Sequence, residues 1–437
     1  MSDRVLRPDV AILAAALPPI VLAAVLAAGA SGAEKPARQD PADTRAVTIR
    51  TVAARTVTAG TVTAPTAPAG PRLADFDLRR GTGFAAPIRM LDRRLARSDV
   101  SAVLESSGQS RIAHGCARAA GVPSDSLVLC WDREDSTTRA WVPQGVSSVS
   151  DATADEEWGG TALLVSWYAR RGIRVSFVNP SRGTYRHVLL VQPVIRGGLA
   201  TYEDIGVHAG GIAWFGNRLY VADTRAGLRE FDMSHIYDLA RSRAGSAAGG
   251  QVGLYGGKYH ARGYRYVMPQ TGNWHYTSGL APVDRCRGTG PLRTSWVSID
   301  RTGGRRPVLA AGEYCGAKRP LGRVVTWPLR EGWGLGGSGS LARASWAATL
   351  PDDKIQGGVR TNGYWWFSRN RDSGSRSRRG QLLLTYRTRA GWADVLHRAA
   401  SYGPEDLSCF RGQNRIWTVS EHAGKRALWG TPAEPCA

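Results

Sequence analysis

The sequence predicts an all-β fold, a β-propeller of five blades with about four strands in each blade. One short plan of strands recurs five times from about residue 125 onward. The 52 glycines and 15 tryptophans of the chain suit many tight turns and aromatic-rich strands. Long helical patterns are few, and short helical pieces are expected only near 87–105 and near Ile236–Arg243. A two-sheet sandwich with decorations is the alternative fold.

The first 33 residues have the layout of a secretory signal peptide. Arg4 and Arg7 precede an almost wholly apolar run over Ala11–Ala28, and Ser31-Gly32-Ala33 offers small residues for cleavage before Glu34. A secreted, extracellular protein is therefore expected. An uncleaved membrane anchor is the alternative, because the apolar run approaches the length that spans a bilayer.

Residues 34–72 are expected to form a disordered linker, since they are rich in Thr, Ala and Pro and cannot bury a core. Residues 73–437 are assigned to the propeller domain, and 73–140 is expected to be partly irregular. The last repeat has no room for a fourth strand before Ala437. An N-terminal strand commonly completes such a ring and removes an exposed sheet edge. Either Leu127–Trp131 or Thr138–Val142 would supply it.

The clearest copy of the repeat reads as three strands, Gly210–Phe215, Arg218–Thr224 and Gly227–Asp232. A bare propeller blade needs roughly 40–50 residues. The early copies are longer than this and carry insertions, of which Gly183–Gln192 and Tyr264–Met268 can supply outer strands. Equivalent starts lie 66, 84, 63 and 48 residues apart, at Gly145, Gly211, Ser295, Gly358 and Asp406.

All six cysteines lie beyond the predicted signal peptide, and an even count in an exported chain favours disulfides. No cysteine belongs to a C-x-x-C pair, which argues against a zinc or redox site. Many pairings are possible, and joining sequence neighbours gives Cys116–Cys130, Cys286–Cys315 and Cys409–Cys436.

The formal charge is +21, from 57 basic and 36 acidic residues, and all but five of the basic residues are arginine. This balance fits a GC-rich genome that favours arginine codons, and a polyanionic partner is the alternative explanation. The charge is dispersed apart from Arg369–Arg379, which reads as a solvated loop. No nucleic-acid-binding motif accompanies it, so neither a specific nucleic-acid partner nor, after signal removal, a membrane partner is expected. We expect a monomer.

The run Arg218–Thr224, followed by Gly227–Asp232, resembles blades of NHL-like and YncE-like β-propellers. The region from Trp141 to the C-terminus also resembles uncharacterised secreted propeller proteins of actinobacteria. Such propellers include binding modules, lactonases, esterases and lyases, so the resemblance implies a fold more than a function. The unequal repeat lengths and the cysteines depart from a regular NHL protein.

Residues that open the innermost strand of each blade tend to face a mouth of the central channel. Carboxylates there would suit Ca²⁺ or another divalent cation, and amides would add oxygen ligands or hold a polar molecule. The alternative is polar packing with ordered water. The ligand-binding candidates are Gln144, His208, Gln356, Glu405 and Asp406, of which Glu405 and Asp406 are the best metal ligands.

No catalytic residue is assigned, because the chain has no nucleophile elbow, zinc-protease helix, P-loop or dinucleotide fingerprint. The expected function is a secreted binding or scaffold propeller for a polar extracellular ligand, with carbohydrate or cell-wall polymer the favoured class. A hydrolase or lyase of lactonase, esterase or glycosidase type, acting at the central channel, is the alternative. Trp274 and Trp365 either stack on sugars or pack between blades.

The signal layout predicts a mature protein that begins near Glu34 and accumulates in the culture medium. N-terminal sequencing of the exported protein checks the cleavage position. An intact Met1 recovered in the membrane fraction would favour the uncleaved anchor instead.

Overall fold

Antiparallel strands dominate the structure, and the all-β prediction is confirmed. The computed structural model describes residues 70–156, 158, 161–304, 306–316, 319–371 and 377–436. The predicted signal peptide and nearly all of the predicted linker lie outside these residues. The described residues belong to a compact unit that runs from Thr66 to Ala437.

Each repeat of the sequence folds into a four-stranded group whose strands follow one another mainly in chain order. Inside a group, neighbouring strands pair antiparallel. The first group is β5 (Val142–Ser148), β6 (Leu163–Tyr168), β7 (Ile173–Asn179) and β8 (Thr184–Arg196). The second is β10 (Ile212–Phe215), β11 (Arg218–Asp223), β12 (Gly227–Asp232) and β17 (Tyr266–Tyr276).

The next two groups repeat this order. The third is β18 (Trp296–Asp300), β19 (Val308–Gly312), β20 (Arg323–Arg330) and β23 (Trp346–Thr349). The fourth is β24 (Ile355–Thr361), β25 (Tyr364–Arg369), β26 (Gln381–Arg387) and β27 (Trp392–Ala399). A parallel pairing of β8 with β17 joins the first two groups into one larger, curled sheet.

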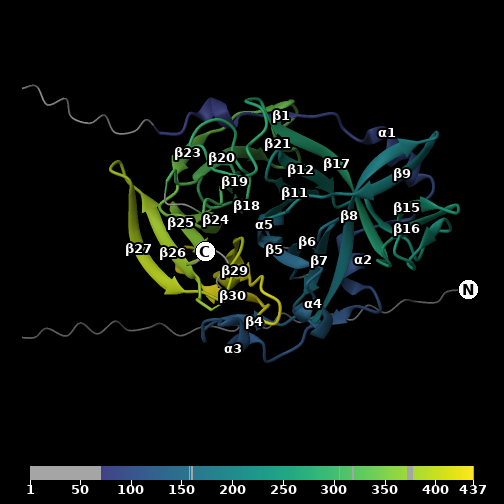
Figure 1. The fold of residues 1–437 in the computed structure, drawn as a ribbon, viewed down its shortest axis with the longest axis horizontal. Helices are drawn as coiled ribbons and strands as arrows, with labels where there is room; N and C mark the ends of the chain where they lie inside the picture. Colours follow the sequence, from purple (N-terminus) through teal and green to yellow (C-terminus); the bar gives the residue numbers. More distant parts are fainter. Residues whose placement is uncertain are drawn as a thin grey trace, which may run out of the picture. The chain divides into compact units, whose positions relative to one another are not determined.

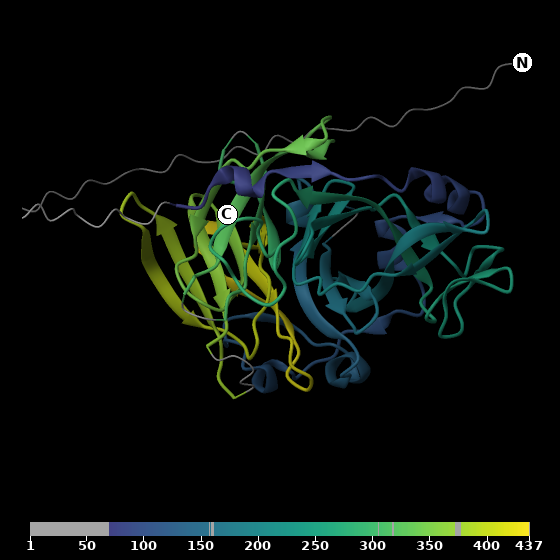
Figure 2. The same ribbon diagram turned by 45° about the horizontal axis from the view of Figure 1, so that its top comes forward.

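The last group is completed by a strand from the N-terminal part of the domain. It consists of β28 (Ser408–Phe410), β29 (Arg415–Val419), β30 (Leu428–Pro432) and β4 (Leu127–Leu129). Strand β4 pairs antiparallel with β30, with Trp429 opposite Val128, so the first of the two predicted closing segments is the one that pairs. The N-terminal segment accordingly lies beside the C-terminal strands (Figures 1 and 2).

The first strands of the groups contact one another in a closed series. Strand β5 contacts β10, β10 contacts β18, β18 contacts β24, β24 contacts β28, and β28 contacts β5. Figure 1 shows β5, β18 and β24 near the middle of the groups and β27 at the periphery. Glycine makes this contact possible, because a Cβ at Gly145 would meet the backbone nitrogen of Ile212 at 2.6 Å. At Gly211 it would meet the nitrogen of Val297 at 2.3 Å.

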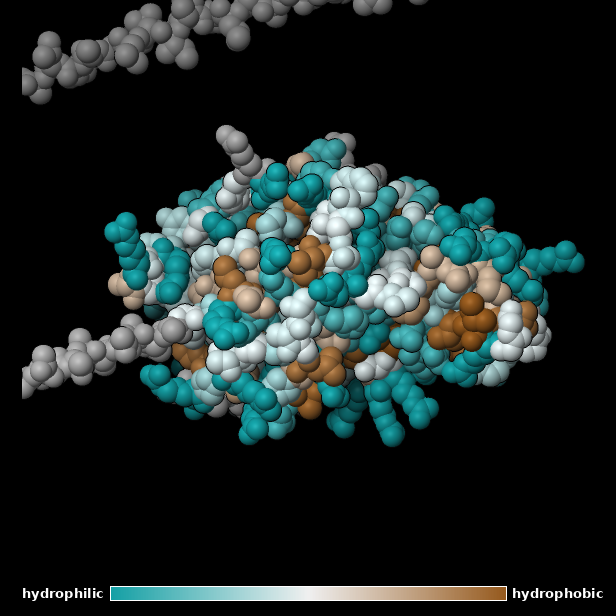
Figure 3. Space-filling model, turned by 90° about the horizontal axis from the view of Figure 1, so that it is seen from above, coloured by the Kyte–Doolittle hydropathy of each residue, from teal (hydrophilic) through white to brown (hydrophobic). Residues whose placement is uncertain are grey.

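Tryptophans fill the space between the strand groups. Trp274 and Trp365 are both buried, and the indole nitrogen of Trp274 donates to Glu230 at 2.8 Å. Both side chains therefore pack inside the fold, and neither is placed to stack on a sugar. On the face drawn in Figure 3, the hydrophobic surface is divided into small groups among hydrophilic side chains.

The helices are short, and none in the described part of the chain is long and apolar enough to cross a bilayer. Helices α1 (Ala85–Asp92) and α2 (Val100–Glu105) confirm the helical prediction near 87–105. The prediction near Ile236–Arg243 is wrong, because Ile236–Asp238 forms strand β13, whose buried residues pair with β17 and β2. The remaining elements are short helices and strands that connect or flank the five groups. They are α3 (Ala117–Ala120), α4 (Arg133–Thr137), α5 (Val149–Ala152), β1 (Leu78–Arg80), β2 (Arg97–Ser98), β3 (Ser110–Arg111), β9 (Leu199–Asp204), β14 (Gly245–Ser246), β15 (Val252–Tyr255), β16 (Lys258–Ala261), β21 (Gly334–Leu335), β22 (Leu341–Ala342) and the 3-10 helices Leu73–Phe76, Arg411–Gln413 and Glu434–Cys436.

The cysteines form the three disulfides that pairing of sequence neighbours predicts, Cys116–Cys130, Cys286–Cys315 and Cys409–Cys436. Disulfides persist in oxidising compartments, which agrees with an extracellular location. Cys130 directly follows the closing strand β4, and Cys409 lies in β28. Two of the bridges therefore fasten the group in which the two ends of the domain meet.

Replacing Cys409 and Cys436 together with alanine should lower the free energy of unfolding by about 2–5 kcal/mol. The Cys286/Cys315 double variant is a matched control, because the two bridges close loops of 27 and 29 residues and have nearly the same chain-entropy effect. We expect the larger loss for the Cys409/Cys436 variant, whose cysteines are buried at the closure. Chemical denaturation measures both, and unchanged stability of that variant would contradict the closure role.

Candidate functional site

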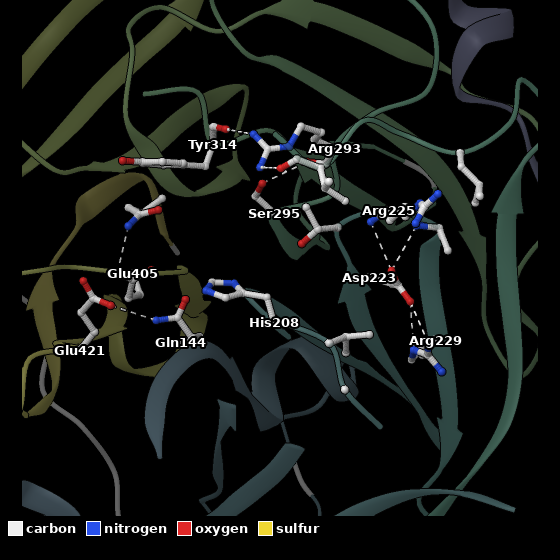
Figure 4. A pocket seen from close by; sticks show the side chains of 17 residues that line it. Gln144, His208, Asp223, Arg225, Arg229, Arg293, Ser295, Tyr314, Glu405 and Glu421 are labelled. Carbon is white, nitrogen blue, oxygen red and sulfur yellow. Dashed lines mark hydrogen bonds and ion pairs between the residues drawn. The ribbon is translucent and has the colours of Figure 1, made fainter. Parts of the chain in front are cut away.

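A cavity of about 850 Å³ lies where the first strands of the groups begin. Each first strand supplies a lining residue at or just before its start, because the closed series of contacts brings the same end of every first strand together. Four of these were predicted from the sequence, and a serine was not. The lining residues of this kind are Gln144, His208, Ser295, Gln356 and Glu405 (Figure 4).

One wall of the cavity is rich in hydrogen-bond acceptors. The amide nitrogen of Gln144 donates to Glu421 Oε2 at 3.3 Å and to the carbonyl of Pro143 at 2.9 Å. Both amide hydrogens are then used, which leaves Gln144 Oε1 as an acceptor. The amide nitrogen of Gln356 donates to Glu405 Oε1 at 3.1 Å. These two amide–carboxyl pairs define what we call the acceptor wall.

Glu405 is an acid whose burial favours the protonated form. Its side chain is only 2% exposed. Burial raises the pKa of Glu405 well above its ordinary value, and the negative charges of Glu421 and Asp406 raise this pKa further. Glu405 therefore holds its proton at higher pH than an ordinary carboxyl group, beside the second carboxyl of the acceptor wall.

Asp406 lies in the interior below the cavity, which corrects its prediction as a channel-mouth residue. It is fully buried, does not line the cavity, and accepts a hydrogen bond from the backbone nitrogen of Ile212 at 3.2 Å. Adjacent side chains of an extended segment face opposite sides, so Glu405 and Asp406 cannot both face the cavity. Burial raises the pKa of Asp406 well above its ordinary value.

Among the described residues, no group of three metal-ligating side chains lies at this cavity, where the cation site was predicted. Across the described ranges, the one group of three metal-ligating side chains is Cys286, Glu313 and Cys315. Its two cysteines are joined in a disulfide, and Glu313 is engaged by the guanidinium of Arg323 at 2.7 Å. The donors at the cavity therefore suit an organic ligand better than a Ca²⁺ ion, which takes six to eight oxygens.

The opposite wall carries arginines that sequence reasoning missed. Arg225, Arg229 and Arg293 line the cavity, and Arg229 forms an ion pair with Asp223 at 3.0 Å. Arg293 donates to the backbone carbonyls of Tyr314 and Val283, and no carboxylate in the described part of the chain pairs with its guanidinium. We call these three arginines the arginine wall.

The turn at the end of β11 positions the arginine wall. Asp223 accepts hydrogen bonds from the backbone nitrogens of Arg225 at 3.2 Å and Ala226 at 3.1 Å and so fixes the turn. The Asp-Thr-Arg sequence predicts a turn here, but it does not predict that the arginine of the turn faces the cavity. Arg293 lies in the long connection before β18, which no sequence pattern assigns to a site.

His208 lies between the two walls (Figure 4). It lines the cavity, and its ring packs against the ring of Tyr168, with 4.4 Å between centroids. The surrounding protein removes water from much of the imidazole, and this desolvation, with a smaller effect of the Arg293 charge, lowers the pKa of His208 to about 4. His208 is thus neutral at physiological pH and acts as a hydrogen-bonding group.

Comparison with known proteins assigns the chain to no family: no family model matches the sequence, and no curated protein matches it.

Glu405→Gln should raise stability above neutral pH. A carboxyl group with a folded-state pKa above its unfolded value contributes stability that is lost as the pH rises through the folded pKa. Each unit of elevation corresponds to about 1.4 kcal/mol, and glutamine matches the shape of the protonated acid. Melting temperatures between pH 5 and 9 test this. The melting temperature of the wild type should fall more steeply toward high pH than that of the variant. If the two melting temperatures change with pH in parallel, the pKa of Glu405 is not raised by its surroundings.

Proposed function

We propose that this chain is an exported β-propeller of five blades that binds a polar extracellular ligand at the mouth of its central channel. The closed series of first strands and the closing strand β4 support the propeller architecture. The resemblance to NHL-like and YncE-like propellers, and to secreted actinobacterial propellers, is part of the proposal. The disulfides and the signal layout support export.

The convergence of polar side chains on one cavity carries the functional proposal. Gln144 and Glu405 are 261 positions apart in the sequence, yet both line the same 850 Å³ space, and Gln356 and His208 line it as well. A cavity of this size holds a small organic ligand. A few convergent polar groups in a large pocket are the usual mark of a binding site, because they fix the orientation of a ligand.

Carbohydrate, free or as part of a cell-wall polymer, is the ligand class that the acceptor wall supports best. Sugar hydroxyls donate to amide and carboxyl oxygens, and Gln144 Oε1 and the Glu421 carboxylate offer such acceptors. A neutral His208 can donate or accept in the same network. The exposed side chains of Leu280 and Val283 line the cavity too and offer apolar contact for the C–H face of a sugar ring.

One observation favours an enzyme as the second candidate. Burial raises the pKa of Glu405 and so favours its acid form beside the Glu421 carboxyl group, and glycoside hydrolysis uses such a pair of carboxyl groups as acid and base. A hydrolase or lyase would place the scissile bond of the ligand next to these two residues. Release of reducing ends from wall polysaccharides separates the two candidates, because a binding protein releases none.

Gln144→Ala should weaken saccharide binding about tenfold, the effect of losing about 1.4 kcal/mol of hydrogen bonding. Calorimetric titration of the mature protein with oligosaccharides from bacterial cell walls and plant polysaccharides measures this. Gln192→Ala, on strand β8 and outside the cavity, is the matched control and should bind like the wild type. Equal affinities for all three proteins, or no saccharide binding by the wild type, would contradict the proposal.

A further inference from the structure

The two walls of the cavity offer opposite kinds of hydrogen-bonding group. The acceptor wall presents amide and carboxyl oxygens from Gln144, Gln356, Glu405 and Glu421, and the arginine wall presents guanidinium donors. His208 stands between the walls (Figure 4). A ligand that satisfies both walls must therefore carry hydrogen-bond donors on one part and an anionic group on another.

Carboxylates balance only part of the positive charge of the arginine wall. Asp223 balances Arg229, but in the described part of the chain Arg293 binds backbone carbonyls and the Cys286 sulfur and no carboxylate. Arg225 is exposed, and among the described residues no carboxylate pairs with its side chain. Two guanidinium groups at one cavity without carboxylate partners suit a carboxylate, sulfate or phosphate, since guanidinium binds such oxyanions through paired hydrogen bonds.

The acceptor wall favours neutral hydroxyl groups over a cationic amine. Two of its four side chains are uncharged amides, and burial raises the pKa of Glu405 well above its ordinary value, which favours the neutral form of that acid. His422 lies beside the remaining carboxylate, Glu421, at 3.5 Å. The negative charge that would hold an ammonium group is thus small. The formal charge of +21 on the whole chain also attracts polyanions over long range.

We propose that the ligand of this cavity is an acidic saccharide, whose hydroxyl groups bind the acceptor wall and whose anionic substituent binds Arg225 and Arg293. The inference rests on the proposed function, because it names the class of ligand for the same cavity. Apolar contact from Leu280 and Val283 beside Arg293 would cover the C–H face of the sugar that carries the anion.

The test uses oligogalacturonate, its fully methyl-esterified counterpart of equal length, a sulfated oligosaccharide and a zwitterionic dipeptide as probes. The mature wild type should bind the uronate at least about tenfold more tightly than the neutral ester, the effect of one charge-assisted hydrogen bond. Binding of the sulfated probe alone would place sulfate or phosphate, and not carboxylate, on the arginine wall and keep the inference of an acidic saccharide. Preference for the dipeptide would overturn it.

Arg225→Gln should weaken binding of the uronate about tenfold and leave the ester unchanged. Arg243→Gln is the matched control, since Arg243 is also exposed but lies outside the cavity. An equal loss in both variants would indicate diffuse attraction to the basic surface and overturn the site. If the uronate and the ester bind with equal affinity, and only Gln144→Ala lowers these affinities, the inference of an acidic saccharide fails while the proposed function stands. If no saccharide binds, both fail.

Discussion

Close packing of the first strands around a common axis is the constraint on which the rest of the structure depends. Glycine at 145 and 211 removes the side chains that would separate neighbouring strands. Serine hydroxyls then link one strand group to the opening of the next. Ser166 of β6 donates to the carbonyl of Ala209 at 2.9 Å, and Ser368 of β25 donates to the carbonyl of Glu405 at 2.5 Å. Small hydroxyl residues thus satisfy backbone carbonyls that face the axis.

This packing also places polar side chains between the first strands, where hydrogen bonds hold them. Asp406 accepts a backbone hydrogen bond from β10, and Asp151 below it accepts hydrogen bonds from the hydroxyls of Ser147 and Ser408, both at 2.7 Å. Burial raises the pKa of Asp151 to about 6. The side chains of Ser147 and Ser408 and the backbone of β10 therefore meet in one hydrogen-bond network, which ties the last group to the first two.

The cavity forms because the first strands close around the axis. Where the first strands begin, the glycines give way to larger polar residues, so the axis opens into a space lined by Gln144, Gln356 and Glu405. Its opposite side comes from the turn after β11 and the connection before β18, which are free of the packing constraint. One wall comes from the repeated first strands and the other from loops, and such a division lets a rigid scaffold hold one particular ligand.

Much of this architecture is determined by the sequence itself. Alternating apolar and polar residues, bounded by turn residues, predict strands such as Arg218–Asp223. Cysteines that are neighbours in the sequence pair with each other. Both features depend on local spacing in the chain. The need to complete the last repeat also predicts a closing strand at Leu127–Trp131 or Thr138–Val142, and the structure selects the first of these through the pairing of β4 with β30. Only the tertiary structure decides that Glu405 faces the cavity while Asp406 points inward, and that Glu421, Arg225 and Arg293 meet there. Their positions depend on the direction of loops and on contacts between segments far apart in the chain, which no local pattern records.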